Sequence, residues 1–324
     1  VIPTAIKISA HIDLTKKLIP ALNDLISTIE KKAKSVDGVI KTGRTHLMDA
    51  MPINFSEELS AWSSQLRASN EMINIIANKF LILPQGGTAV GSGINAHKQF
   101  SRYFSQEITK LYPGKYKFIP SKNFYHELSS QDCSVQLSGE LKNLAVILMK
   151  ISNDLRWMNS GPLTGLSEIE LKALQPGSSI MPGKVNPVIP EAVAMASADV
   201  IGNDASITIA AQSGSFQLNV MLPVIAYNLL KSINLMAGSM SVLSQKAIKS
   251  FRVNVKNLET SLSKNPILVT ALNPIIGYES AAAIAKKAYK ENRPIIDVAS
   301  EETDIPIAKL KKLLDPTKLS KGGI

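Results

Sequence analysis

The sequence has little cysteine, few aromatic residues and no long apolar run. Its one cysteine, Cys133, cannot form an intramolecular disulfide or a thiolate cluster, and it lies in a helical pattern typical of a small buried side chain. No charge-free apolar run of about 18 residues occurs, so we expect no membrane-spanning helix and no membrane partner. Aromatic residues make up only 5% of the chain, and its lysines are scattered. The net charge of +10 therefore does not predict nucleic-acid binding.

Histidine is also scarce. The four histidines, His11, His46, His97 and His126, lie far apart in the sequence, and no pair has metal-ligand spacing. We therefore expect no metal site. A single free cysteine is typical of a reducing cytosol, which favours a cytoplasmic location. The chain starts with Val1 and shows no leader pattern, so we expect it to begin inside a longer protein, and a mitochondrial location stays open.

What the sequence has in abundance is apolar residues at helical spacing. A heptad seam is sustained for three heptads by Leu137, Leu141, Leu144, Leu148, Ile151, Leu155 and Met158. The same spacing recurs between Phe55 and Phe80 and between Leu222 and Leu243, while residues 3–36 and 187–211 also read as helices. These stretches exceed the usual helix length of about 11–12 residues. They predict an all-α fold, a long-helix bundle shared within an oligomer.

The pattern of apolar residues changes after about residue 250. The seam ends there, and shorter helical stretches follow with turns at Asn265-Pro266, Asn273-Pro274 and Asp315-Pro316. We expect two domains, a central helical bundle over residues 1–250 and a small helical C-terminal domain over residues 251–324.

The segment from Gly177 to Pro187, Gly-Ser-Ser-Ile-Met-Pro-Gly-Lys-Val-Asn-Pro, is the richest in polar chemistry. Its glycines, prolines and serines predict a loop that can present successive backbone N–H groups to an anion. Lys184 adds a positive charge and Asn186 an amide donor. Such a set suits a dicarboxylate whose reacting form gains negative charge, although a solvated loop would have a similar composition.

A second candidate segment runs from Thr42 to Pro52, between two long helical stretches. His46 stands there beside Thr45 and Arg44. Histidine is the side chain best matched to proton transfer near neutral pH. A lone histidine is nevertheless more often structural, so the residues by themselves leave both interpretations open.

The loop resembles the signature of the fumarase/aspartase superfamily, Gly-Ser-Ser-x-Met-Pro-x-Lys-x-Asn-Pro, at every fixed position. The resemblance extends along nearly the whole chain. Blocks similar to those of class II fumarases are Gly43-Arg44-Thr45-His46, Gly86-Gly87-Thr88-Ala89-Val90-Gly91, Asn153-Asp154-Leu155-Arg156-Trp157 and Thr270-Ala271-Leu272-Asn273. His46, the Gly-Gly-Thr-Ala block and Gly183 favour fumarase over aspartase, whereas Val188-Ile189-Pro190-Glu191 resembles aspartase.

The resemblance implies a fumarate hydratase of the tricarboxylic acid cycle, which hydrates fumarate reversibly to (S)-malate. It implies that Ser178 is the base, that His46 transfers a proton through water and that Glu191 orients His46. Substrate binding is implied for Thr45, Ser179, Lys184, Val185 and Asn186. The resemblance further implies a homotetramer with sites shared between subunits, and this chemistry needs no redox or metal cofactor.

Two other functions are compatible with the resemblance, and the sequence differs from the family pattern at two places. The alternatives are an aspartate ammonia-lyase of the same superfamily and a catalytically inactive structural helical oligomer. Leu163 stands where fumarases commonly carry arginine. The family's N-terminal domain, with further substrate-binding segments, is not present upstream of Pro3, so we expect residues 1–324 alone to be weakly active or inactive.

Overall fold

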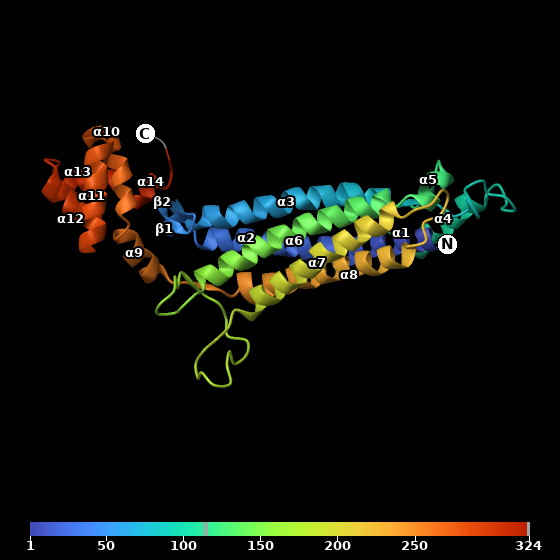
Figure 1. The fold of residues 1–324 in the computed structure, drawn as a ribbon, viewed down its shortest axis with the longest axis horizontal. Helices are drawn as coiled ribbons and strands as arrows, with labels where there is room; N and C mark the ends of the chain where they lie inside the picture. Colours follow the sequence, from blue (N-terminus) through green and yellow to red (C-terminus); the bar gives the residue numbers. More distant parts are fainter. Residues whose placement is uncertain (113, 115, 323–324) are drawn as a thin grey trace. The chain divides into compact units, whose positions relative to one another are not determined.

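The computed structural model describes residues 1–112, 114 and 116–322. Most of these residues are helical, as the sequence predicted, and Figure 1 shows the order of the elements. The α-helices are α1 (Ile2–Asp13), α2 (Ile19–Ser35), α3 (Phe55–Lys79), α4 (Phe100–Leu111), α5 (Phe124–Ser129), α6 (Asp132–Met158), α7 (Val188–Gln212), α8 (Leu222–Val242), α9 (Val255–Ser263), α10 (Asn273–Ile276), α11 (Tyr278–Glu291), α12 (Ile295–Glu302), α13 (Ile307–Leu313) and α14 (Pro316–Leu319).

Short helical and extended segments complete the fold. Two π-helical segments, η1 (Leu14–Leu18) and η2 (Leu243–Ile248), continue α1 and α8, and η3 (Pro266–Leu272) is a 3₁₀ helix. The strands are β1 (Ile40–Thr45), β2 (Met48–Asn54), β3 (Ile82–Leu83), β4 (Ile119–Pro120), β5 (Ile169–Glu170) and β6 (Arg252–Val253). They form three two-stranded pairs, of which β3–β4 is parallel and β1–β2 and β5–β6 are antiparallel.

The chain divides into two compact units. The first unit comprises Val1–Thr28, Ser63–Arg156 and Ala173–Ile248, and the second comprises Ile29–Trp62, Trp157–Lys172 and Lys249–Ile324. The expected domain boundary at residue 250 stays a prediction. The second unit joins the C-terminal helices to residues from two earlier parts of the chain.

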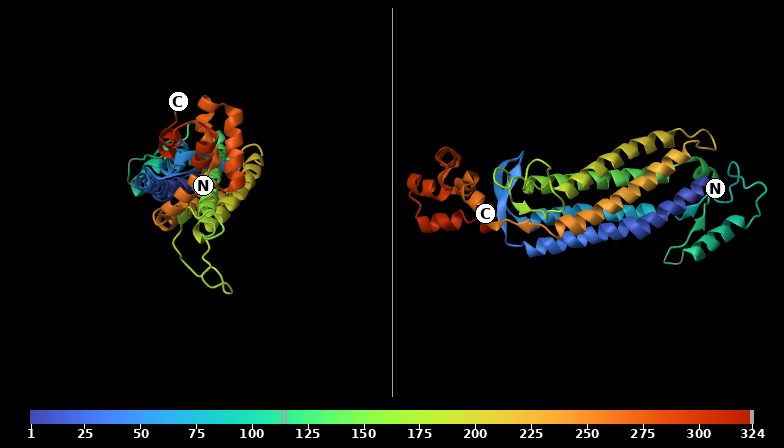
Figure 2. Two further views of the ribbon diagram at one scale, coloured as in Figure 1. Left: turned by 90° about the vertical axis from the view of Figure 1, so that its left-hand side faces the viewer. Right: turned by 90° about the horizontal axis from the view of Figure 1, so that it is seen from below.

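The first unit is a bundle of long helices, with α7 and α8 side by side in both figures (Figures 1 and 2). Its core contains the predicted apolar seam of α6. Leu137, Leu141, Leu144, Leu148 and Ile151 of the α6 seam are all fully buried. Because each such side chain is removed from water, burial contributes roughly 1.5–3 kcal/mol per residue to stability. Of the described residues, none belongs to a helix with the length and apolarity needed to cross a membrane.

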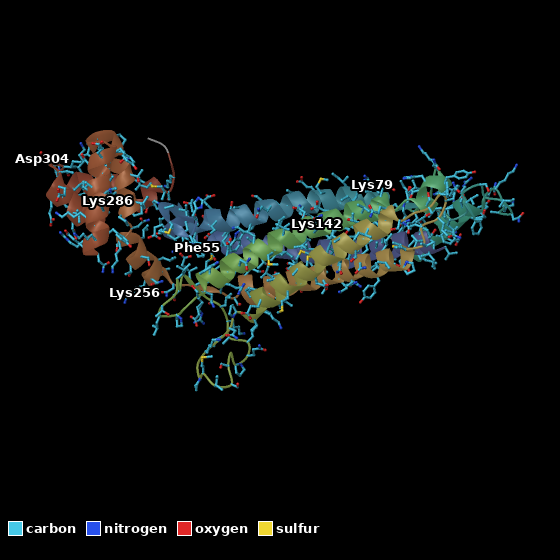
Figure 3. The ribbon with its side chains drawn as sticks, viewed as in Figure 1. Phe55, Lys79, Lys142, Lys256, Lys286 and Asp304 are labelled. Carbon is cyan, nitrogen blue, oxygen red and sulfur yellow. The ribbon has the colours of Figure 1, made fainter. Side chains whose placement is uncertain are left out.

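One buried carboxylate inside the bundle is paired across two helices. The buried carboxylate of Asp204 on α7 accepts hydrogen bonds from the Ser138 hydroxyl at 2.7 Å and the Lys142 ammonium at 2.6 Å, both on α6. Figure 3 labels Lys142 on α6. A buried carboxylate without such partners would destabilise the fold strongly, so these contacts specify how α6 and α7 pack.

The second unit has a small helical core of its own. Residues of α9, η3 and α11–α13 bury one apolar cluster that includes Leu272, Ile284, Val298 and Leu310. Asn265 begins η3 by accepting a hydrogen bond from the backbone N–H of Ile267 at 3.0 Å. This capping role agrees with the turn that Asn265-Pro266 predicted.

The buried ring of His11 predicts a loss of stability at acid pH. Its Nδ1 lies 3.1 Å from the carbonyl oxygen of Ala77, and its ring packs edge-on against Tyr116 and Phe118. Burial lowers the pKa of His11 below its ordinary 6.5, and the contact with Ala77 offsets only part of this effect. The unfolded chain therefore binds the proton more readily. The free energy of unfolding should fall as the pH decreases below about 6.5, by at most ~1.4 kcal/mol per pH unit, and then level off below the folded-state pKa.

Urea denaturation between about pH 7.5 and 5 measures this effect. A His11→Gln variant should show a flatter pH dependence than the wild-type protein. The matched control is His126→Gln, because His126 is exposed, and it should keep the wild-type slope. Equal slopes for the wild type and His11→Gln would contradict the prediction.

Candidate functional site

Two hydrogen bonds join the ends of a loop that lies between β5 and α7. The backbone N–H of Gly177 donates to the carbonyl oxygen of Lys184 at 2.9 Å, and the Asn186 amide donates to the carbonyl oxygen of Gly177 at 3.0 Å. A Cβ atom on Gly177 would lie 2.2 Å from the Lys184 oxygen, so only glycine fits here. In Figure 1 this yellow-green segment is a long loop that leads into α7.

Ser178 lies inside that closed loop. Its Oγ accepts hydrogen bonds from the backbone N–H groups of Ile180 at 3.2 Å and Met181 at 3.0 Å. Two N–H dipoles directed at one oxygen stabilise negative charge on it. Because both groups are part of the backbone, they are in place before any ligand binds. The loop therefore directs two backbone donors at this hydroxyl oxygen.

Lys184 and Asn186 form the cationic side of the same loop. The Lys184 ammonium donates to Oδ1 of Asn186 at 2.9 Å, and the Lys184 side chain is exposed. Ser179 and Val185 are exposed as well. The structure thus brings Ser178, Ser179, Lys184, Val185 and Asn186 together in one loop, as their sequence spacing predicted.

Thr45 and His46 lie on a β-hairpin of the second unit, where the sequence predicts a connection between two long helical stretches. Strands β1 and β2 pair Thr45 with Met48, so His46 and Leu47 form a two-residue turn. Both have positive φ, 54° and 61°. Two-residue hairpin turns with positive φ at both central residues are of type I′, and this conformation costs roughly 1–2 kcal/mol for each non-glycine residue. No Asn-Gly or Asp-Gly pair signalled the turn, and that is why it was missed.

Both Thr45 and His46 are exposed, and Glu191 is half-buried near the start of α7. Glu191 belongs to the first unit and His46 to the second. The pairing of these two side chains therefore stays a prediction.

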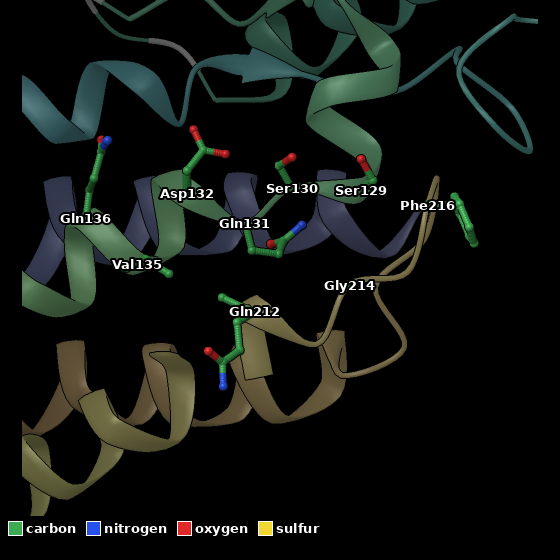
Figure 4. A pocket seen from close by; sticks show the side chains of 10 residues that line it. Ser129, Ser130, Gln131, Asp132, Val135, Gln136, Gln212, Gly214 and Phe216 are labelled. Carbon is green, nitrogen blue, oxygen red and sulfur yellow. The ribbon is translucent and has the colours of Figure 1, made fainter. Parts of the chain in front are cut away.

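A separate depression of about 490 Å³ lies in the first unit, where α6 begins and α7 ends (Figure 4). None of the eight residues assigned from the sequence lines it. Its lining is Ser129, Ser130, Gln131, Asp132, Val135, Gln136, Ala211, Gln212, Gly214 and Phe216. Within the part of the chain that the structure describes, no cluster of three or more His, Cys, Asp or Glu side chains could hold a metal ion.

Comparison with known proteins decides the family. Residues 1–202 match the family model described as "Lyase", and residues 268–321 match "Fumarase C C-terminus". The chain is 58% identical over 324 residues to fumarate hydratase class II 2 of Pseudomonas aeruginosa, covering 100% of this chain and 70% of the relative. The chain belongs to the class II fumarate hydratase family. The predicted resemblance is confirmed.

Other members of this family agree. Fumarate hydratase class II of Bacillus subtilis is 43% identical over 319 residues, covering 98% of this chain and 69% of the relative. The crystal structure of class II fumarase from Schistosoma mansoni superposes with a TM-score of 0.93 at 34% identity, over 98% of this chain and 69% of that chain. The fumarate lyase:delta crystallin structure from Brucella melitensis gives a TM-score of 0.91 at 38% identity, over 98% of this chain and 68% of that chain. The predicted all-α fold is thereby confirmed.

Proposed function

We propose that this protein is a fumarate hydratase that interconverts (S)-malate and fumarate in the tricarboxylic acid cycle of the cytoplasm. The observation that carries the proposal is the environment of Ser178, whose Oγ accepts two backbone N–H bonds inside a loop bearing Lys184 and Asn186. The curated relatives named fumarate hydratase support the same reaction.

The difficult step in dehydrating malate is removal of a proton from the carbon beside a carboxylate. Ser178, as an alkoxide, takes that proton, and the Ile180 and Met181 N–H groups stabilise the alkoxide beforehand. The electron pair left on carbon delocalises into the adjacent carboxylate, which becomes a dianionic aci-form. The Lys184 ammonium and the Asn186 amide stabilise this added charge.

Loss of hydroxide completes the reaction. The electron pair of the aci-form returns to make the carbon–carbon double bond, and the hydroxyl group leaves. We assign His46 to deliver a proton through water, so that the leaving group departs as water. Glu191 orients His46 and stabilises its positive charge, as the carboxylate does in a Ser-His-Asp triad. Hydration of fumarate runs through the same steps in reverse, and neither direction requires electron transfer to a cofactor.

Thr45, Ser179 and Val185 complete the proposed substrate contacts. The loop and the hairpin belong to different units, and we propose that each site combines them in a homotetramer whose subunits share active sites. Exposed apolar side chains on the bundle helices, such as Met72, Ile75 and Ile209, suit burial between subunits.

The test is an ultraviolet assay of the purified protein at its natural length. Malate should produce the rising absorbance of fumarate, and fumarate should be consumed in water to give (S)-malate alone. Aspartate should release no ammonia. Ammonia from aspartate together with no fumarate from malate would replace the proposal with an aspartate ammonia-lyase. A folded oligomer inactive on both substrates would make the protein a structural one.

A further inference from the structure

Glu168 is a buried carboxylate that no step of the proposed reaction uses. It is 2% exposed, and each of its oxygens has a cationic partner. Oε2 lies 2.5 Å from the Lys41 ammonium, and Oε1 lies 2.5 Å from Nη1 of Arg44. Both cations stand on β1, the strand that leads into Thr45 and His46. One carboxylate thus holds the hairpin at two points.

The backbone around Glu168 is itself held in place. Its N–H donates to the carbonyl oxygen of Met158 at 2.7 Å, and its carbonyl oxygen accepts from the N–H of Asn254 at 2.9 Å. The next two residues pair with β6. The backbone of Glu168 is therefore fixed by hydrogen bonds, and its two ion pairs fix strand β1 of a hairpin whose turn is exposed.

A bulge in the hairpin makes the double contact possible. Residues three apart on a regular strand point to opposite faces, and Lys41 and Arg44 are three apart. The β1–β2 register shifts between Thr42 and Arg44, which turns both side chains toward the same carboxylate. A Cβ atom on Gly43 would lie 2.7 Å from the carbonyl oxygen of Met51, so the bulge needs glycine. The contact with Glu168 and the hairpin register therefore depend on each other.

The two cations depend on Glu168 to different degrees. Lys41 also pairs with Glu58 at 2.8 Å and lies 4.9 Å from the centre of the Phe55 ring. Among the ion pairs of the described residues, Arg44 has Glu168 alone. Arg44 adjoins Thr45 directly, so the loss of Glu168 releases the end of the strand that presents His46, while Lys41 stays neutralised.

We propose that Glu168 is a positioning residue that acts through Arg44 to hold Thr45 and His46 in the orientation that catalysis requires. The inference rests on the proposed function, because its kinetic readout is malate turnover. A displacement of about 1 Å at a reacting group can cost about 100-fold in rate. Removing the link should therefore lower kcat more than it raises KM.

The experiment compares Glu168→Gln with Glu58→Gln in the protein at its natural length. Both changes remove one carboxylate partner of Lys41, but only the first releases Arg44. Glu168→Gln should lower kcat by roughly 10- to 100-fold with a small change in KM, and Glu58→Gln should stay within about twofold of wild type. Glu168→Asp should recover part of the lost rate. The Glu168→Gln/Arg44→Gln double variant should be no slower than Arg44→Gln alone, because the two residues act as one unit.

Hydrogen exchange at the amides of residues 44–49 supplies a readout independent of turnover. Exchange should rise in Glu168→Gln and Arg44→Gln and stay at the wild-type level in Glu58→Gln. If Glu168→Gln does not fold, Arg44→Gln alone should show both the lowered kcat and the faster exchange. Wild-type kcat and wild-type exchange in a folded Glu168→Gln, or equal losses in Glu58→Gln, would overturn the inference. Failure of the wild-type protein on malate would instead overturn the proposed function, and the exchange data would still test the hairpin link.

Discussion

Ser178→Ala should lower kcat for malate and for fumarate by about 1,000-fold or more, while the oligomer and its thermal stability remain those of wild type. The variant removes the oxygen that accepts from the Ile180 and Met181 N–H groups, and with it the proposed base. General base catalysis contributes typically 100- to 10,000-fold, and stabilisation by fixed N–H donors contributes a comparable factor. KM should change less, because Lys184 and Asn186 still bind the carboxylates.

Stopped assays with a long time base measure the residual rate, and the matched control is Ser206→Ala. Ser206 is an exposed serine on α7 whose hydroxyl bonds to the Gly202 carbonyl oxygen, and its loss should leave turnover within about twofold of wild type. Solvent exchange of the malate C3 proton offers a second test, since Ser178→Ala should abolish it together with turnover. A wild-type rate in Ser178→Ala would remove this residue from the mechanism.

His46→Asn should lower kcat by roughly 100-fold or more, because it removes the titrating group that assists departure of hydroxide. Asparagine is the appropriate replacement because His46 has φ of 54°, and asparagine tolerates this left-handed backbone well. The hairpin should therefore keep its turn, and any loss of rate reports on chemistry.

The pH dependence of kcat distinguishes this role from a structural one. Because the proposed proton donor is removed, the pH profile of kcat in His46→Asn should differ from that of the wild-type protein. His126→Asn serves as the control, because His126 is exposed and its ring contacts Asp132 and Glu127, neither of which is assigned to the reaction. An unchanged profile in His46→Asn would assign the proton transfer to another group.

Features that depend on neighbouring residues were predictable from the sequence, whereas features that depend on distant contacts were not. The seam from Leu137 to Leu155 is buried as its spacing predicted, because helical period is a property of neighbouring residues. The loop from Gly177 to Pro187 was likewise recognisable, since the residues that close it lie within ten positions of each other. The site roles assigned to Ser178, His46 and Glu191 stay predictions.

The hairpin was not predictable in the same way. His46 and Leu47 have no turn composition, and their positive φ angles are maintained by the strands on either side. Asn265 bonds the carbonyl oxygen of Ala50 from 215 positions away, which adds another constraint that no local pattern encodes. Tertiary contacts outweighed the weak local preference of these residues for another conformation.

The sequence by itself determined the helical bundle, the polar loop and the family, because each is encoded in the order and spacing of nearby residues. Only the tertiary structure decided how the hairpin carrying His46 is held. Glu168 lies 127 positions from Lys41 and 124 from Arg44, and its importance is invisible until folding buries Glu168 and Lys41 together and brings Arg44 beside them. A buried carboxylate must find cationic partners wherever the fold provides them, and this requirement acts through space rather than along the chain.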